Sequence, residues 1–361
     1  MERTDQIERL KKEAIYEMLH YHEKSGKQKV KELLKKAAGR YVPPKDLISW
    51  PTGLLANTLS ENYELWEEKE TVLAALKEYF DRWLTIGAPV YFIDDVLCGT
   101  ALLNLYRLSG EEKYKEGANK LVQYLYAIEN VDGAGSIPYR PNQNNRYVFV
   151  DGIGMICPFL CRYGMEMGDE TAISLAIKQL RNMLKYGMEG KMWLPYHGFE
   201  YESRTKYGII GWGRAAGWLL AGIAGALSHL PKEHEAFAEL QNSFMKIVIS
   251  TANYQKENGA FAWQLEALEG PEDSSAAAMI GQAVLSAQRC GVIKNNPEEN
   301  ICRKLVQRAA EYIAGCEQEG KIYGCSGECI GFAQYPQVYG AYPWSLGPGL
   351  ELLLCTLKRE R

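Results

Sequence analysis

The stretch YVFVDGIGMICPFL, residues Tyr147–Leu160, contains a pattern that recurs along the rest of the chain. It begins with a β-branched and aromatic run, typical of a short strand, which leads directly to the carboxylate Asp151. An apolar, helix-like segment follows. An Asp at the start of a helix often caps it by accepting hydrogen bonds from the free N–H groups of the first turn. Because the same order recurs elsewhere with polar or aromatic groups at the same point, Asp151 is also a candidate functional residue.

Two kinds of helical segment alternate along the chain. Six segments have apolar residues at the i, i+3/i+4 spacing of a helix with one wet face. These sets are Ile7, Leu10, Ala14 and Met18; Val72, Leu76, Phe80 and Trp83; Tyr114, Ala118, Leu121 and Leu125; Ile173, Ile177, Leu180 and Leu184; Phe237, Leu240, Phe244 and Ile247; and Ile301, Leu305, Ala309 and Ile313. Six others are apolar on most faces, which predicts buried helices: Gly53–Leu59, Val96–Leu108, Ile153–Met167, Ala215–Leu230, Ala276–Gln288 and Leu346–Leu357.

Short strand-like runs that follow a glycine also recur. Gly133, Gly190, Gly259 and Gly320 begin such runs and are 57, 69 and 61 residues apart. A period of about 60 residues fits about six times into the 361-residue chain and indicates an array of helical hairpins. We therefore predict an all-α fold, a single (α/α)6-barrel domain over residues 1–361, with the N-terminal helix as the partner of the last inner one. The strand-like pieces would lie in loops of about twenty residues at the end where the inner helices begin.

Composition excludes several classes of protein. A hydrophobic fraction of 47% with 24% charged residues is typical of a soluble globular protein. A net charge of −4, with no basic block beyond Lys27–Lys36, argues against a nucleic-acid partner. No apolar run approaches the roughly 20 residues that span a bilayer, and the N-terminus has no apolar signal core. We expect neither a membrane partner nor a secretory leader.

The nine cysteines include no CxxC pair. Cys325 and Cys329 are four residues apart, but no His or Cys spacing nearby in the sequence completes a zinc site. This pattern predicts free thiols in a reducing cytoplasm rather than disulfides, and a protein without a bound metal or other cofactor.

The N-termini of the predicted inner helices would converge at one end of the barrel. They would bring together Trp50, Asp94 and Asp95, Asp151, Trp212 and Arg214, and the polar and aromatic residues of 272–275 and 342–345. Converging helix N-termini favour an anion. Aromatic rings with paired carboxylates in a concave mouth indicate a carbohydrate site with acid/base chemistry. Asp95 is interpreted as a helix cap or a solvated neighbour of Asp94, and which of the two faces the site stays open.

Several motifs resemble the signatures of glycoside hydrolase families 88 and 105, the unsaturated glucuronyl and rhamnogalacturonyl hydrolases. Residues 151–159, DGIGMICPF, resemble D-G-L-x-M…P-F. Residues 196–200, YHGFE, resemble Y-H-G-W-D/E, and residues 212–218, WGRAAGW, resemble W-G-R-G-N-G-W. Segments 94–99, 272–279 and 343–350 resemble further family segments in the same order. The resemblance extends over roughly residues 50–355 and implies the same (α/α)6 barrel.

The resemblance implies hydrolysis of oligosaccharides that end in a 4,5-unsaturated uronic acid left by a polysaccharide lyase, from pectin- or glycosaminoglycan-like polymers. In the family one Asp protonates C4 of the enol ether, water adds at C5, and the hemiketal opens to release the aglycone. Asp151 matches that acid/base Asp, and Asp94 matches the second carboxylate. The predicted substrate-binding residues are His197, Arg214, Trp212, Trp218, Met155, Arg140, which would lie near the uronate, and Trp50 at the mouth.

Some residues depart from the family pattern. Ala215 and Ala216 replace the G-N of the family motif, and Phe199 replaces its usual Trp. These changes leave the identity of the sugar at and beyond the cleavage point undetermined, but they do not affect the acid/base pair. One alternative is a sugar epimerase on the same barrel, which would need a His pair where only His197 is placed. Another is a catalytically inactive carbohydrate-binding relative that has lost the acid. His197 as a backbone-satisfied loop residue, and the two Trp residues as plain core, are the structural alternatives.

Overall fold

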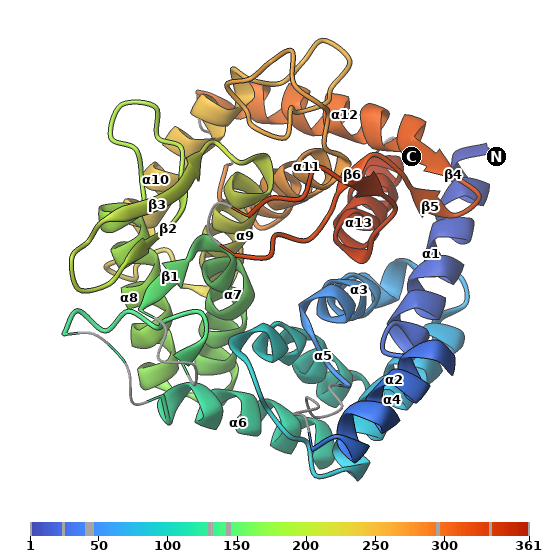
Figure 1. Cartoon of the computed structure of the whole chain (residues 1–361). Coiled ribbons are helices and arrows are strands. Elements are labelled where there is room, and N and C mark those ends of the chain that lie inside the picture. Colours follow the sequence, from blue (N-terminus) through green and yellow to red (C-terminus); the bar gives the residue numbers. More distant parts are fainter. Residues whose placement is uncertain are drawn as a thin grey trace.

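The computed structural model describes residues 2–23, 26–39, 47–128, 131, 133–141, 146–293, 297–331 and 334–359. Within these residues, helices form two concentric rings around one axis (Figure 1), which confirms the predicted all-α barrel. The inner helices are α3 (Trp50–Glu61), α5 (Gly99–Ser109), α7 (Val150–Met167), α9 (Gly213–His229), α11 (Ser274–Arg289) and α13 (Pro343–Arg359). The outer helices are α1 (Glu2–His20), α4 (Lys69–Thr85), α6 (Glu112–Tyr126), α8 (Glu170–Tyr186), α10 (Phe237–Ala252) and α12 (Glu299–Cys316).

Helix α1 closes the ring at the N-terminus. It packs against α13, α3 and α4, as expected from pairing the first outer helix with the last inner one. Its predicted apolar face is buried, with Leu10 and Ala14 fully inaccessible to solvent. In α12 the prediction was wrong at the first position of the apolar face. Ile301, which was predicted to face the core, is 40% exposed, and the next residue, Cys302, is buried instead.

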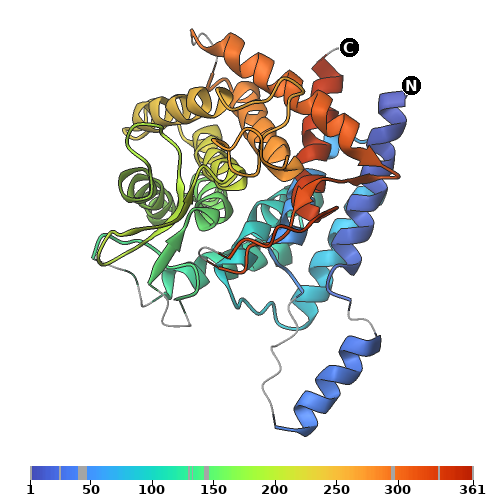
Figure 2. The ribbon, with the colours of Figure 1, turned by 45° about the horizontal axis from the view of Figure 1, so that its top comes forward.

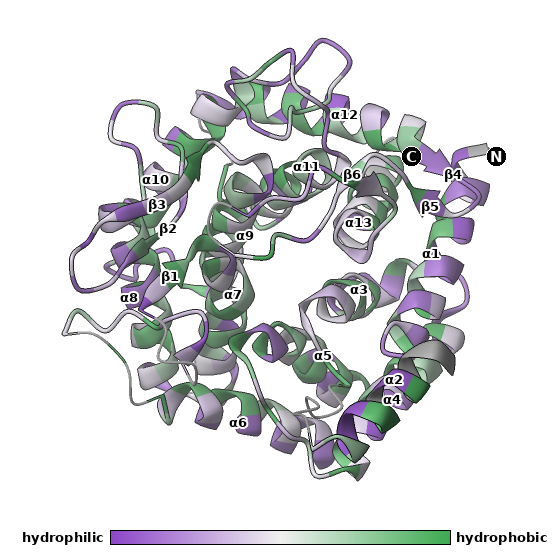
Figure 3. Ribbon diagram, viewed as in Figure 1, coloured by the Kyte–Doolittle hydropathy of each residue, from purple (hydrophilic) through white to green (hydrophobic). Residues whose placement is uncertain are grey.

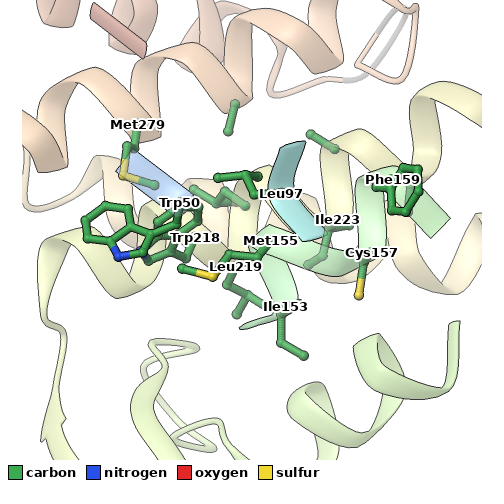
Figure 4. Packing of buried hydrophobic residues seen from close by; sticks show 14 of the residues in the cluster. Trp50, Leu97, Ile153, Met155, Cys157, Phe159, Trp218, Leu219, Ile223 and Met279 are labelled. Atoms are coloured by element: carbon green, nitrogen blue, oxygen red, sulfur yellow. The ribbon is translucent and has the colours of Figure 1, made fainter. Parts of the chain in front are cut away.

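Small residues let the inner helices approach one another closely. A Cβ atom at Gly154 of α7 would lie 2.5 Å from the Trp218 ring of α9 and 2.7 Å from its carbonyl oxygen. Gly222 of α9 meets α7 in the same way, since a Cβ there would lie 2.9 Å from the Ile153 carbonyl oxygen. The close-up in Figure 4 shows Met155, Trp218 and Trp50 together in the core that this approach creates. The short distance between the inner helices thus explains why they are rich in glycine and alanine.

One helix lies outside the two rings. Helix α2 (Gly26–Ala37) was not among the predicted pairs, and it projects from the body of the barrel (Figure 2). Among its described side chains, Val30, Leu33 and Leu34 are each more than half exposed. Figure 3 shows the opposite trend elsewhere, with hydrophilic colours concentrated on the outer faces of the outer ring.

The short strands lie in loops that precede inner helices. Strands β1 (Tyr147–Phe149), β2 (Tyr196–Glu200) and β3 (Lys206–Ile210) form an antiparallel sheet in the order β1-β2-β3, and β1 leads directly to α7. Two smaller pairs join β4 (Glu317–Gln318) to β5 (Lys321–Ile322), and β6 (Cys325–Ser326) to β7 (Tyr339–Gly340).

The loop between α4 and α5 is shorter than predicted. The 3-10 helix η2 (Ile93–Cys98) begins only seven residues after α4 and leads directly to α5. A second 3-10 helix, η1 (Tyr63–Leu65), follows α3. The expectation of a twenty-residue loop was therefore wrong here, because a 3-10 turn starts the inner helix early.

The cysteines are free, as predicted, although not all are buried, since Cys290 is exposed. In the part of the chain that the structure describes, no helix is both long enough and apolar enough to cross a membrane.

Candidate active site

A cavity of about 390 Å³ lies where three inner helices begin. We call it the mouth cavity. Trp50 comes from the start of α3, Asp151 from the first turn of α7, and Arg214 from the first turn of α9. Its other lining residues come from loops and β1: Tyr139, Arg140, Phe149, Glu328, Cys329, Ile330 and Gly331. The cavity has the size of a small-ligand pocket, and its lining combines aromatic rings with charged groups of both signs.

Asp151 is held at the cavity by the junction between β1 and α7. Helix α7 begins at Val150 with Phe149 as its N-cap, so Asp151 lies inside the first turn and is not the N-cap residue. The side chain is only 9% exposed. Its Oδ2 atom lies 3.2 Å from His197 Nε2 but makes no hydrogen bond of acceptable geometry. A buried carboxylate oxygen without a hydrogen bond destabilises the fold, so its presence calls for an explanation such as a catalytic role.

His197 is fully buried beside Asp151. Pairing of β1 with β2, with Phe149 opposite Gly198, brings it there. On its other side, Nδ1 lies 3.0 Å from the Tyr335 hydroxyl, which also accepts a hydrogen bond from the Ile209 N–H. The ring therefore has a side-chain partner at each nitrogen, unlike the backbone-satisfied histidine considered above.

Asp94 and Asp95 have different roles. Asp95 accepts hydrogen bonds from the backbone N–H groups of Tyr91 and Phe92, at 2.8 and 3.1 Å, and so caps η2. Asp94 Oδ2 lies 2.9 Å from Arg140 Nη2, and the Tyr139 hydroxyl donates a hydrogen bond to the same carboxylate. Burial raises the pKa of the Asp94 carboxyl above its ordinary value, while the Arg140 guanidinium opposes that rise. Of the two, Asp94 is therefore the candidate site residue, because its partners Tyr139 and Arg140 line the mouth cavity.

Arg140 is fixed above two rings, 4.5 Å from the centroids of both Phe92 and Tyr139. Its Nη1 atom is buried and has no hydrogen-bond partner, and the same is true of Asp94 Oδ1. Asp151 Oδ2, Asp94 Oδ1 and Arg140 Nη1 are thus among the buried polar atoms at this end of the barrel that lack a hydrogen bond. Such a set is suited to a polar ligand that carries both hydroxyl and anionic groups.

Arg214 lines the cavity, but its guanidinium donates hydrogen bonds to other residues of the protein. Its Nη1 donates to the hydroxyls of Ser275 and Ser326, and its Nη2 donates to the Gly327 carbonyl at 2.8 Å. The Asp273 carboxylate, 3.9 Å away, accepts from both the backbone N–H and the hydroxyl of Ser326. Arg214 and Asp273 thus hold the segment that follows β6 against the barrel.

The predicted aromatic residues are distributed over three places. Trp50 lines the mouth cavity. Trp218 and Met155 instead line a second cavity on the barrel axis, so the structure does not support their placement in the mouth cavity. Trp212 is fully buried behind His197, with ring centroids 4.9 Å apart, and Arg214 lies 4.6 Å above its ring. Trp218 is therefore packed between inner helices, and Trp212 is packed against His197 and Arg214.

The sequence did not predict the contribution of residues 325–331 and of Tyr335. Glu328 and Cys329 line the cavity, and Tyr335 contacts His197. Partial desolvation raises the pKa of the Glu328 carboxyl, although the side chain keeps contact with solvent, and the nearby Asp94 carboxylate adds to the effect. The only sequence signal was that this segment lies in one of the long loops, which have no periodicity from which side-chain direction could be inferred.

Comparisons with known proteins give one matching family model, a curated relative in sequence and several solved structures of similar fold. The family model described as Glycosyl Hydrolase Family 88 matches residues 14–356. The chain is 26% identical over 326 residues to an unsaturated rhamnogalacturonyl hydrolase, YesR, of Bacillus subtilis, covering 86% of this chain and 90% of the relative. Among solved structures it resembles a possible member of family GH105 from Klebsiella pneumoniae, with TM-score 0.83, 15% identity and coverage of 99% and 94% of the two chains. It also resembles an unsaturated glucuronyl hydrolase specific for heparin, with TM-score 0.70, 18% identity and coverage of 98% of each chain.

Proposed function

We propose that this chain, which belongs to glycosyl hydrolase family 88, removes a 4,5-unsaturated uronic acid from the non-reducing end of an oligosaccharide. Family membership makes it a glycoside hydrolase. The substrate is the proposed part, and we favour rhamnogalacturonan-derived fragments over glycosaminoglycan fragments. The reason is that the relative named for the former covers most of the chain in sequence.

The observation that carries the proposal is the buried Asp151 carboxylate, with an unbonded oxygen, beside a second buried carboxylate, Asp94. In the proposed reaction Asp151 gives a proton to C4 of the enol ether, which leaves positive charge at C5 and its ring oxygen. Water adds to C5 and returns its proton to the Asp151 carboxylate. The hemiketal opens by cleavage of the bond between C5 and the ring oxygen, and the aglycone leaves from C1.

The two carboxylates differ in their partners, which supports separate roles for them. Asp94 is tied to Arg140 and Tyr139, so it is fixed and its charge is partly neutralised. Asp151 has an imidazole at ion-pair distance, and its Oδ2 accepts no hydrogen bond, so this oxygen is available to a reacting group. We assign proton transfer to Asp151, positioning of Asp151 to His197, and sugar hydroxyl binding to Asp94.

Arg140 is the better candidate for the substrate carboxylate. Its Nη1 is buried without a partner, whereas Arg214 already bonds Ser275, Ser326 and Gly327. A guanidinium with a free N–H group in a partly dry cavity forms strong charge-assisted bonds to an anion. We therefore place the uronate carboxylate toward Arg140 and treat Arg214 as a residue that shapes the cavity wall.

Neither alternative function is favoured. Of the five histidines, only His197 contacts a carboxylate of the mouth cavity, so the His pair of an epimerase is missing from this site. An inactive binding protein would not require both Asp94 and Asp151 to be buried with unbonded oxygens. We expect a cytoplasmic enzyme that works without a metal, in keeping with its free thiols.

The test is direct. Unsaturated disaccharides produced by lyases from rhamnogalacturonan and from glycosaminoglycans are incubated with the protein, and loss of the ultraviolet absorbance of the C4–C5 double bond is followed. We expect turnover of the rhamnogalacturonan product, and its loss in Asp151→Asn. If the protein consumes none of the unsaturated disaccharides, the proposal is wrong. If it prefers a glycosaminoglycan product, only the choice of substrate is wrong.

A further inference from the structure

Three ligand atoms of different elements gather at one side of the mouth cavity. His197 Nε2 lies 3.2 Å from Asp151 Oδ2 and 3.8 Å from Cys329 Sγ. All three atoms lie within 4.8 Å of one another, and this is the only such cluster among the residues that the structure describes. Cys329 was set aside at the sequence level because no ligand lies near it in the chain. The fold supplies both partners from remote segments.

The spacing of these atoms fits a tetrahedral zinc ion. Zinc binds His nitrogen at about 2.0–2.1 Å, Cys sulfur at about 2.3 Å and carboxylate oxygen at about 2.0–2.2 Å, which puts neighbouring ligand atoms about 3.3–3.6 Å apart. The observed 3.2 and 3.8 Å differ from these values by a few tenths of an ångström. The third pair, the Asp151 carboxylate and Cys329 Sγ, lies within 4.8 Å, so these two side chains would have to approach each other by up to about 1.2 Å around a bound ion.

The chemistry of the three ligands selects the kind of metal. One thiol, one imidazole and one carboxylate form a set that suits zinc, whereas calcium and magnesium prefer oxygen ligands only. The Asp151 side chain is 9% exposed and its Oδ2 has no hydrogen bond, so a polar atom already points into the cluster without a partner. The adjoining cavity leaves room for a water or anion as the fourth ligand.

The surroundings of the ligands act in both directions, because burial raises the pKa of the Cys329 thiol and so disfavours the thiolate that a metal binds. The Tyr335 hydroxyl, 3.0 Å from His197 Nδ1, can accept a hydrogen bond from the Nδ1–H group, which is the tautomer whose Nε2 lone pair can coordinate a metal. Arg214, a positive group that lines the same cavity, is engaged by Asp273 at 3.9 Å and by Ser326. Its charge is thereby partly neutralised before a cation enters.

We propose that Asp151, His197 and Cys329 form a binding site for one zinc ion, and that zinc inhibits the enzyme. A carboxylate coordinated to zinc has no proton to give, so the ion and the reacting double bond compete for Asp151. The inhibitory part rests on the proposed function of Asp151, whereas the binding part does not. Zinc in this site acts against catalysis and is not a cofactor.

Cobalt(II) is the probe for binding, because a cysteine ligand gives it a thiolate-to-metal charge-transfer band in the near ultraviolet. The intact protein is titrated with cobalt(II), and zinc is then added to displace it. We expect one equivalent to bind with this band in the native protein. Loss of a hydrogen-bond partner of a ligand typically lowers metal affinity about 10–100-fold, so Cys329→Ser should lower it at least about 100-fold and remove the band.

Cys290→Ser is the matched control, because Cys290 is an exposed free thiol far from the cluster in sequence. This variant should bind cobalt(II) like the native protein. A measurement on the native protein avoids any dependence on variant folding: zinc should slow alkylation of Cys329 by iodoacetamide, mapped by mass spectrometry, and leave that of Cys290 unchanged. A band that persists in Cys329→Ser, or alkylation of Cys329 that zinc does not slow, would overturn the site.

Turnover separates the site from the role of Asp151. Zinc should inhibit the native enzyme and Cys290→Ser competitively with the unsaturated disaccharide, and a chelator should reverse the inhibition. If the charge-transfer band appears as expected but saturating zinc leaves turnover unchanged, the metal site is supported and the inhibitory proposal, with the assignment of Asp151 as the acid, is refuted.

Discussion

Replacing Arg140 by Met should destabilise the fold and weaken binding of the uronate. Met keeps much of the side-chain length but removes the cation that lies 2.9 Å from Asp94 Oδ2. Because Asp94 is only 6% exposed, its charge would remain buried without its ion-pair partner. A hydrogen bond between charged groups contributes about 1.5–3 kcal/mol, so we expect a loss of that size in the free energy of unfolding at pH 7.

The loss should shrink as the pH falls. Burial raises the pKa of Asp94 while Arg140 opposes the rise, so the pKa of Asp94 in Arg140→Met is higher still. Between the ordinary Asp value of 3.8 and the pKa in the folded variant, the folded state holds a proton that the unfolded chain has released. The variant then gains stability as the pH falls, by up to about 1.4 kcal/mol per pH unit.

Urea unfolding at pH 7 and pH 5 measures both effects. Arg146→Met is the control, because Arg146 pairs with Glu202 on the surface, where both side chains are more than half exposed. An exposed ion pair contributes about 0–1 kcal/mol, and its loss should not depend on pH in this range. With the best substrate, kcat/KM of Arg140→Met should fall by about one to two decades. Equal destabilisation of Arg140→Met at both pH values would show that Asp94 does not depend on Arg140.

Three further predictions test the acid, the cavity wall and the closure of the ring. Asp151→Asn should lower kcat by about two to four decades with little change in KM, and EDTA should leave the native activity intact; near-native turnover of the variant would move the acid elsewhere. Arg214→Gln should speed proteolytic cleavage within residues 325–331, because the hydrogen bonds to Ser275, Ser326 and Gly327 weaken; an unchanged cleavage rate would contradict the positioning role. Deletion of residues 1–23 exposes the flank of α13. The loss of several buried side chains, at about 1.5–3 kcal/mol each, should abolish cooperative unfolding. A truncated protein that melts like the intact one would refute closure of the ring by α1.

The architecture could be predicted because its signals are local. An apolar face at i, i+3 and i+4 is set by residues within one helix, so the inward faces of α1 and α4 were recoverable from the sequence. The Gly-rich inner helices were equally predictable from the sequence, because a helix that is buried on all sides is apolar on all of its faces. Helix α2 was missed because it lies outside the two rings, and the repeat on which the prediction was based contains no place for it.

The site was predictable only where its residues begin helices. Asp151 and Asp94 are located by their position at the start of inner helices, and the structure places both beside the mouth cavity. The role of Arg214 was not predictable, because its partners Ser275 and Ser326 come from two other segments of the chain. Trp218 shows the converse limit: a motif position suggested the sugar pocket, whereas close approach of α7 and α9 turns the ring toward the axial cavity.

The three-stranded sheet explains how remote residues form one reactive group. Phe149 of β1 pairs with Gly198 of β2 in antiparallel register. His197, which precedes Gly198, therefore lies beside the start of α7 and contacts Asp151. In a sheet, a shift of one residue turns every side chain to the opposite face, so this register is a condition for the Asp–His contact. Gly208 on β3 supports the same register, because a Cβ atom there would lie 2.4 Å from His197 Cβ and 2.6 Å from the Tyr335 hydroxyl. The loop sheet is thus part of the site, since it positions the residue that contacts Asp151.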